Sequence, residues 1–277
     1  MIKNNFPLVS VIITTRNEES VIEKLLQSVC AQTYPSVEVV LVDNNSTDRT
    51  CAIANLYVDK LIMQGPERSA QRNRGVREAG GEYVLILDAD MELSTNVVKE
   101  AVDCVIKEPS IKALIIPEQS FGLNFWARCK ALERNCYIDD VSEVTGARFY
   151  ERQTFLQVGG FDEAITGPED WDLSQRVAQV TQIGSIRSLI HHNEGHINLL
   201  SQMQKKYYYA QNLRSYIRKN PKQFWRQANF LLRPAYFRHW RDLVRQPHLA
   251  IGMFFLRLCE AFAGAAGALR GYYMNNS

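Results

Sequence analysis

The sequence predicts an α/β fold in which a mostly parallel, doubly wound sheet is flanked by helices. Apolar runs suited to buried strands alternate with helical patterns of about a dozen residues, as is typical of βαβ units. The turns that follow these strands are polar. After residue 200 the composition shifts to Lys, Arg and aromatic residues. We therefore predict two parts: an α/β domain over residues 1–200, and a basic, aromatic-rich helical extension over residues 201–277.

The first ninety residues supply the elements in regular order. Strands are predicted over residues 8–15, 37–42, 58–63 and 83–87, the third of them short and the last apolar throughout and buried. The segments between them predict helices, with a capping box at residues 20–23, a start near Thr47, and a stop at Gly80 and Gly81. Each strand end would meet the others at one edge of a parallel sheet, where open α/β folds bind their ligands.

The strand over residues 83–87 runs directly into Asp88, Ala89 and Asp90. Two carboxylates separated by one small residue suit Mg²⁺ or Mn²⁺, which bind oxygen ligands and keep positions open for phosphates. A pair of acids that only caps the next turn is the alternative. Polar residues after the other strands would border the same cleft, which favours the ligand-binding interpretation.

The order of motifs resembles family 2 glycosyltransferases with the GT-A fold, in particular membrane-associated bacterial or archaeal members. The segments that carry the resemblance follow one another over roughly residues 8–200: residues 9–19, 42–48, 70–75, 81–83, 88–90, 145–149, 159–163 and 169–173. Arg16 departs from the family, where many members have an aromatic residue that stacks on the base. A guanidinium can also stack in this way.

The resemblance implies a nucleotide-sugar donor of the UDP or GDP type and an Mn²⁺ or Mg²⁺ cofactor. The residues it assigns to the nucleotide or donor are Thr15, Arg16, Asn17, Glu18, Asp43, Arg72, Asp88 and Asp90. Asp43 would recognise the edge of the nucleotide base. The alternative interpretation of Arg72 is an exposed arginine in a basic helix. The metal ligands would be Asp90, Asp88 and His192, the last of which could instead be a structural histidine bonded to the backbone.

On the acceptor side, the resemblance makes Asp170 the general base that takes the proton of an attacking hydroxyl, with Glu169 orienting the acceptor. We also assign Trp171 and Arg148 to the acceptor. Acids at a helix start are often caps, and Trp171 could equally pack in the core. The implied reaction is an inverting transfer of a sugar to an acceptor hydroxyl.

Residues 201–277 carry thirteen Lys and Arg but only two acids, although the whole chain has a net charge of +2. Cations interleaved with aromatic rings suit an anionic membrane surface, so we expect residues 201–270 to bind one. Residues 249–269 are long enough to span a bilayer, but Arg257 and Glu260 fall within them, which favours an interfacial position. A lipid-linked glycan or a glycolipid is then the expected acceptor. We expect no nucleic-acid partner, since no reading module is recognised.

Six scattered cysteines without a CxxC pair fit reduced thiols, and the start lacks the apolar core of a signal peptide. We expect a cytoplasmic protein, peripheral on the cytoplasmic face of a membrane. The alternatives are a nucleotide-sugar-binding scaffold or regulatory paralogue without turnover, and a metal-dependent nucleotidyltransferase, whose glycine-rich loop after the first strand is absent. No GxGxxG follows an early strand, which excludes a dinucleotide-dependent oxidoreductase.

Overall fold

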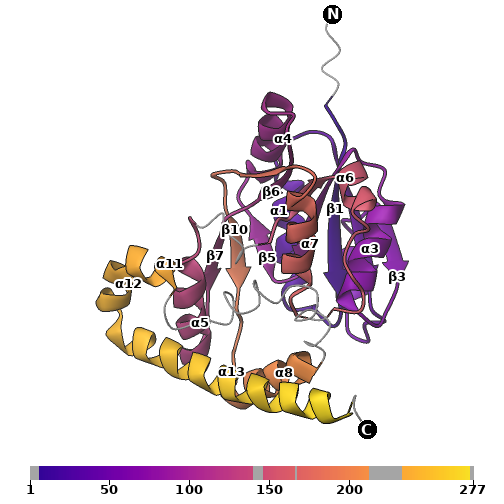
Figure 1. Ribbon diagram of the computed structural model, residues 1–277. Coiled ribbons are helices and arrows are strands. Elements are labelled where there is room, and N and C mark those ends of the chain that lie inside the picture. Colours follow the sequence, from indigo (N-terminus) through magenta and orange to yellow (C-terminus); the bar gives the residue numbers. More distant parts are fainter. Residues whose placement is uncertain (1–5, 140–145, 166, 212–232, 275–277) are drawn as a thin grey trace, which may run out of the picture. The chain divides into compact units, whose positions relative to one another are not determined.

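The computed structural model describes residues 6–139, 146–165, 167–211 and 233–274 (Figure 1). The chain divides into two compact units. The first comprises residues 1–117, 146–163 and 173–191. The second comprises residues 118–145, 164–172 and 192–277, so the C-terminal segment groups with two earlier stretches of chain. The boundary expected at residue 200 stays a prediction.

The first unit is built on a seven-stranded sheet in the order β3-β2-β1-β4-β8-β6-β9. The strands are β1 (Val9–Thr15), β2 (Val37–Asp43), β3 (Lys60–Met63), β4 (Tyr83–Asp88), β6 (Ile111–Ile115), β8 (Phe149–Glu151) and β9 (Gln182–Ser185). Neighbouring strands are parallel except β8, which is antiparallel to both β4 and β6. The predicted mostly parallel sheet is therefore confirmed.

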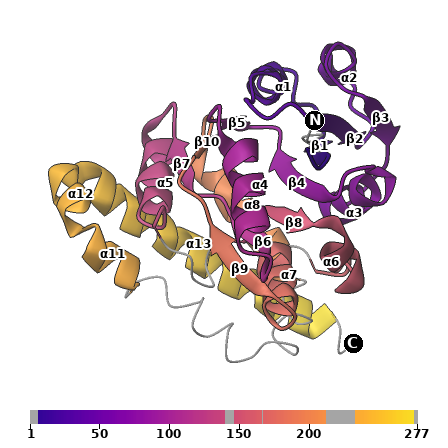
Figure 2. The same ribbon diagram turned by 90° about the horizontal axis from the view of Figure 1, so that it is seen from above.

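Helices cover both faces of this sheet (Figure 2). The helices of the first unit are α1 (Ile22–Cys30), α2 (Thr50–Ala54), α3 (Arg68–Glu78), α4 (Val97–Lys107), α6 (Arg152–Gln157) and the end of α7 (Glu169–Ala178). Alternate residues of β1 separate the two cores: Ile13 packs with α1 and α4, whereas Ile12 packs with α3, α6 and α7. Strands buried on both faces explain the continuous apolar runs in the sequence.

Register brings the carboxyl ends of the central strands to one edge. Thr15 of β1 pairs with Asp43 of β2, and Thr14 pairs with Asp88 of β4. Gly75 lets α3 approach β1, because a Cβ at this position would collide with the side chain of Ile12. The polar residues that follow these strands are therefore placed together by the sheet itself.

Two local predictions need correction. The capping box at residues 20–23 is wrong: α1 begins at Ile22 after Val21, and no side chain caps it. The backbone N–H groups of Val21 and Ile22 instead donate to the carbonyl of Glu18, because the loop after β1 turns tightly into the helix. Helix α2 begins at Thr50 rather than near Thr47.

Strand β10 (Ile190–Asn193) belongs to a small three-stranded sheet in the order β5-β10-β7, with β5 at Met91–Leu93 and β7 at Glu118–Phe121. The chain passes from one unit to the other within β10. In the first unit the backbone N–H of Ser94 donates to the carbonyl of Leu189. In the second unit the backbone N–H of Glu194 donates to the carbonyl of Phe121.

The second unit is mostly helical. Its helices are α5 (Phe125–Asn135), α8 (Leu199–Gln211), α11 (Pro234–Arg238), α12 (Trp240–Arg245), α13 (Pro247–Met274) and the first turn of α7. Its core packs Cys129 and Leu132 of α5 against Leu249 and Met253 of α13. Cys129 and Cys136 are both buried. In the described part of the chain, α13 is one helix long and apolar enough to cross a membrane.

Candidate active site

The loops after β1 and β2 hold each other in place. Asn17, in the left-handed region at φ 56°, receives a hydrogen bond on its Oδ1 from the N–H of Thr47 at 2.8 Å. Its own N–H donates to Ser46 Oγ at 2.7 Å. The N–H of Glu18 donates to Thr50 Oγ1 at 2.7 Å. Asn17 and Glu18, assigned to the nucleoside from the sequence, thus also fix the shape of the second loop.

Asp43 is fully buried at the end of β2 and accepts three hydrogen bonds. The donors are Thr15 Oγ1 at 2.7 Å, the N–H of Ser46 at 2.6 Å, and Ser46 Oγ at 2.6 Å. A carboxylate offers about four acceptor positions, so these bonds leave little capacity for a ligand. The structural role of Asp43 is therefore clear, and its contact with a base stays a prediction.

Gln71 joins the two strand ends and was not among the residues selected from the sequence. Its buried Nε2 donates to the carbonyl of Val42 at 2.8 Å and to that of Thr15 at 3.2 Å. Its position next to Arg72, in the segment over residues 70–75 that carries the family resemblance, was the available signal. Gln71 positions the edge on which the candidate donor residues stand.

Asp88 is held between arginines. Arg72 Nη2 lies 2.7 Å from Asp88 Oδ1, and Arg148 Nη1 lies 3.6 Å from Oδ2. Arg72 is only 1% exposed, and its guanidinium also lies 5.0 Å from the centroid of the Phe161 ring. The alternative of an exposed helix arginine is therefore wrong for Arg72. Arg148, predicted on the acceptor side, lies beside Asp88, which is predicted on the donor side, and both roles stay predictions.

These charges set the ionisation of Asp88. Burial alone would raise the pKa of this carboxyl group, but the positive charges of Arg72, Arg68 and Arg148 outweigh that effect. Its pKa consequently lies well below the ordinary value, and Asp88 is ionised at any physiological pH. The edge of the sheet therefore presents a permanent anion surrounded by cations.

Asp90 follows two residues later and is half-buried. Its carboxylate is a suitable oxygen donor for Mg²⁺ or Mn²⁺, as is that of Asp88, both of whose oxygens lie near arginines. The donor chemistry of Asp88 and Asp90 thus fits a divalent ion. Within the described residues, no three His, Cys, Asp or Glu side chains gather as a metal site. The ligand set Asp88, Asp90 and His192 stays a prediction.

His192, on β10, belongs to the second unit and takes part in a network of charges there. Its Nδ1 lies 3.1 Å from Glu118 Oε2 and 2.9 Å from Arg134 Nη1. Glu194, almost buried, pairs with Arg134 at 2.9 Å and with Lys130 at 2.8 Å. Burial opposes ionisation of Glu194, but these cations together with His192 hold its pKa below the ordinary value.

The start of α7 carries the residues assigned to the acceptor. Glu169 is 2% exposed, and its Oε2 accepts a hydrogen bond from the N–H of Gly167 at 2.5 Å. Gly167 has a φ of 108°, which favours glycine and forms the turn before the helix. Asp170 and Trp171 are half-buried in the first turn. Glu169 therefore fixes the turn that presents Asp170.

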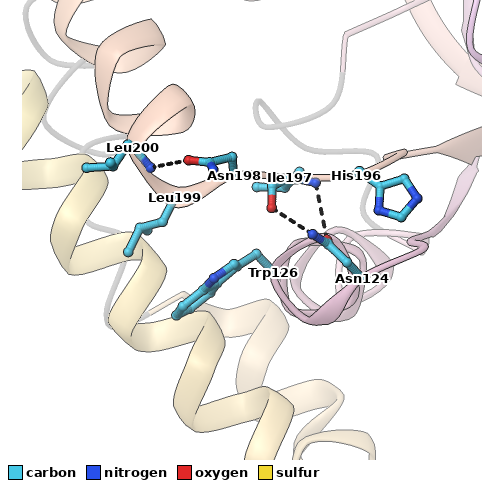
Figure 3. A pocket seen from close by; sticks show the side chains of 7 residues that line it. All are labelled: Asn124, Trp126, His196, Ile197, Asn198, Leu199 and Leu200. Carbon is cyan, nitrogen blue, oxygen red and sulfur yellow. Dashed lines mark hydrogen bonds between the residues drawn. The ribbon is translucent and has the colours of Figure 1, made fainter.

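An open groove of about 550 Å³ lies elsewhere in the second unit (Figure 3). Its walls come from the start of α5, the start of α8 and the segment before α8: Asn124, Trp126, His196, Ile197, Asn198, Leu199 and Leu200. Asn124 caps α5 and also bonds the backbone of Ile197 at 2.8 and 3.2 Å, which fixes the floor of the groove.

The structure thus brings Thr15, Asn17, Glu18 and Asp43 together at one edge, and Arg72, Asp88 and Arg148 together in one ion cluster. Arg16 is exposed beside them. Glu169, Asp170 and Trp171 share one turn, and His192 lies in a separate network.

A family model described as Glycosyl transferase family 2 matches residues 10–161. A beta-monoglucosyldiacylglycerol synthase of Synechocystis sp. is 30% identical in an alignment 199 positions long, and the match covers 62% of this chain and 40% of that protein. A PGL/p-HBAD biosynthesis glycosyltransferase of Mycobacterium bovis is 31% identical in an alignment 179 positions long, and the match covers 61% of this chain and 69% of that protein. The chain spans less than half the length of the cyanobacterial relative.

Two solved structures share the fold. The mannosyltransferase PcManGT from Pyrobaculum calidifontis, in complex with GDP-Man and Mn2+, has a TM-score of 0.57 and 19% identity, covering 99% of this chain and 79% of that one. S. aureus TarS 1–349 in complex with UDP-GlcNAc has a TM-score of 0.57 and 17% identity, covering 96% of this chain and 89% of that one. At this level of identity the likeness is one of fold.

Proposed function

The chain belongs to glycosyl transferase family 2, and from that premise we propose that it moves a sugar from a nucleotide sugar to an acceptor hydroxyl, with inversion at the anomeric carbon. We propose a UDP- or GDP-type donor, because the two structural neighbours were solved with UDP-GlcNAc and GDP-Man. We also propose a lipid-linked glycan or a glycolipid as the acceptor. Relatives named as a monoglucosyldiacylglycerol synthase and a PGL/p-HBAD biosynthesis glycosyltransferase support that class.

The observation that carries the proposal is the ion cluster at the carboxyl end of β4. Arg72 and Arg148 converge on Asp88 there, and Arg68 adds a third positive charge. Guanidinium groups bind phosphates through paired donors and keep their charge at all relevant pH values. An incoming diphosphate would find its counter-charges already in place, held by helix α3 and by the segment that leads into β8.

Asp90, with Asp88 and His192 as the other predicted ligands, would hold Mn²⁺ or Mg²⁺. When bound, such an ion supplies Lewis-acid stabilisation of the leaving diphosphate. The residues of the chain then have two tasks on the donor side. The loops joined by Asn17 and Gln71 orient the nucleoside, and Arg72 stabilises negative charge as it develops on the leaving group.

On the acceptor side, Asp170 would accept the proton of the attacking hydroxyl. A positioned general base typically contributes about 10²–10⁴-fold to rate. The buried carboxylate of Glu169 keeps the Gly167 turn in shape and so holds the start of α7, and Trp171 would offer a ring face to a sugar. Reaction at a membrane surface, on its cytoplasmic face, would bring a lipid-linked acceptor within reach.

The test compares two aspartate variants in the full-length protein. We expect Asp170→Asn to bind UDP- or GDP-sugars as the wild type does, and to lose about 10²–10⁴-fold in transfer. We expect Asp90→Ala to lose the metal-dependent part of donor binding, so that EDTA weakens binding in the wild type only. Titration calorimetry with and without Mn²⁺ measures donor binding, and radiolabelled sugar transfer to a lipid extract measures transfer.

Two matched variants control these changes. Glu23→Gln neutralises an exposed acid in the first turn of α1, and Glu92→Ala removes an acid two residues after Asp90. Both should behave as the wild type. Full transfer by Asp170→Asn would refute the base assignment. Donor binding without turnover in the wild type, on every acceptor tried, would favour the scaffold alternative.

A further inference from the structure

Helix α13 is apolar on two opposite faces. Its inward face is buried and includes Leu249, Met253, Leu256 and Ala263. On the opposite face, five large apolar side chains are between 41% and 73% exposed: Ile251, Phe255, Leu258, Phe262 and Leu269. Their spacings of four, three, four and seven residues place them in one stripe along the helix. We call this set the α13 stripe.

The two charges that fall within α13 do not lie in the stripe. Arg257 forms ion pairs with Glu133 of α5 and with Glu260, whose side chains are 1% and 4% exposed. These groups therefore neutralise one another between the helices of the second unit. In the sequence, Arg257 and Glu260 make residues 249–269 look unsuited to lipid. In the structure neither charge lies on the outward face, so that face carries no ionised group from Ile251 to Leu269.

The inward face is fixed to protein along its length. A Cβ at Gly252 would lie 2.5 Å from Cys129 Sγ of α5, and side chains at Gly267 and Gly271 would collide with the backbone of α8 at Tyr207 and Gln211. Glycine is needed at these positions for the helices to pack so closely. A helix surrounded by lipid would have to give up these contacts, so the geometry favours a helix that lies along a membrane.

Helices α11 and α12, which precede α13, carry exposed aromatic and arginine side chains that an anionic surface would attract. Phe237, Trp240 and Val244 of α11 and α12 are 55–68% exposed. Arg238, Arg241 and Arg245 are exposed between them, and the Arg241 guanidinium lies 5.7 Å from the Trp240 ring. Aromatic rings and arginines together are typical of the boundary between headgroups and acyl chains. The charge favours anionic headgroups over a neutral partner.

The groove described above adjoins the stripe. Trp126, which lines the groove, stacks on Phe255 of the stripe with ring centroids 5.9 Å apart and planes at 28° (Figure 3 shows Trp126). Leu200, also at the groove, is 69% exposed. An apolar surface thus continues from the stripe to a cavity whose other walls include the polar side chains of Asn124, His196 and Asn198.

We propose that the α13 stripe is a membrane-docking surface that lies flat in the interface of an anionic bilayer, with the groove open to lipid headgroups at its edge. The stripe would enter the acyl boundary, and the arginines of α11 and α12 would contact the headgroups. This proposal deepens the proposed function, and rests on it only for the claim that the groove admits the head of a lipid acceptor.

Vesicle flotation without any nucleotide tests the docking surface. We expect the full-length wild type to float with vesicles of phosphatidylcholine and phosphatidylglycerol, and less with phosphatidylcholine alone. The double variant Phe255→Glu/Phe262→Glu should bind at least tenfold more weakly. Leu56→Glu, at a 77%-exposed apolar position of the first unit, should bind as the wild type does. Arg241→Gln/Arg245→Gln should reduce the preference for phosphatidylglycerol.

Three results would overturn the proposal. The first is a wild type that floats with neither vesicle, above all if light scattering shows a dimer that the glutamate variant abolishes. The second is flotation of the glutamate variant equal to that of the wild type. The third is resistance of the bound protein to carbonate extraction, which would indicate a spanning helix. Because Asp170→Asn should float normally, failure of the transfer assay and failure of docking are distinguishable.

Discussion

The buried carboxylate of Glu133 allows a direct test of how α13 is held on α5. Glu133 is 1% exposed, pairs with Arg257, and accepts hydrogen bonds from Tyr236 at 3.0 Å and Tyr137 at 3.3 Å. Glu133→Gln keeps the size of the side chain and removes its charge. Removal of one partner from a buried ion pair costs about 3–5 kcal/mol. Because Arg257 retains Glu260, we expect the lower end, about 3 kcal/mol.

Urea unfolding followed by tryptophan fluorescence measures this loss selectively. All four tryptophans fall within the residue ranges of the second unit, so their signal reports that unit. With a denaturant slope of about 2 kcal/mol/M, the midpoint should fall by roughly 1.5 M. The control is Asp242→Asn, which removes a carboxylate from an exposed pair with Arg245 in the same unit. An exposed pair is worth about 0–1 kcal/mol, so the shift should be small.

The pH dependence gives an independent check. The charge of Arg257 and its hydrogen bond outweigh the effect of burial and hold the pKa of Glu133 below its ordinary value. A carboxyl group with a lower pKa in the folded state contributes stability above its unfolded pKa of about 4.3, and loses it as the pH falls through the folded pKa. The difference between wild type and Glu133→Gln should therefore be largest near neutral pH and shrink in acid. Equal midpoints at pH 7 would refute this account of how α13 is attached.

Two further predictions concern the edge of the sheet that carries the predicted donor residues. Arg72→Met should weaken binding of UDP- or GDP-sugars at least tenfold by calorimetry, because a charge-assisted hydrogen bond is worth about 1.5–3 kcal/mol; Arg74→Met, on the same helix but paired with Glu78 at its surface, should bind normally. Gln71→Leu should speed amide hydrogen exchange in residues 16–19 and 44–50, because the buried bonds to Thr15 and Val42 are lost. Unchanged donor affinity in the first case, or unchanged exchange in the second, would contradict these assignments.

Some local features could not be read from sequence because they depend on which partner a polar group finds. The motif at residues 20–23 has the letters of a capping box, but the tight turn after Glu18 satisfies the helix start with backbone groups. His191 and His192 are adjacent in the sequence and both lie on β10. Only the structure shows that His192 meets Glu118 and Arg134. Arg148 is a similar case, since a strand antiparallel to β4 brings it to Asp88.

The sequence by itself determined the α/β class, the alternation of elements and the edge of the sheet at which Asp43, Asp88 and Asp90 would stand. These follow from short-range patterns: hydrophobic periodicity, and the rule that parallel strands end together. Tertiary structure alone decided the ionic state of that edge and the surface of α13. Arg72 became a buried partner of Asp88 through the packing of α3 on the sheet. Arg257 and Glu260 interrupt an apolar run in sequence, but Arg257 pairs with Glu133, more than a hundred residues earlier in the chain, and Glu260 pairs with Arg257. The outer face of α13 is therefore left apolar. The partner of each charged side chain depends on contacts between residues far apart in the sequence, which local sequence patterns do not predict.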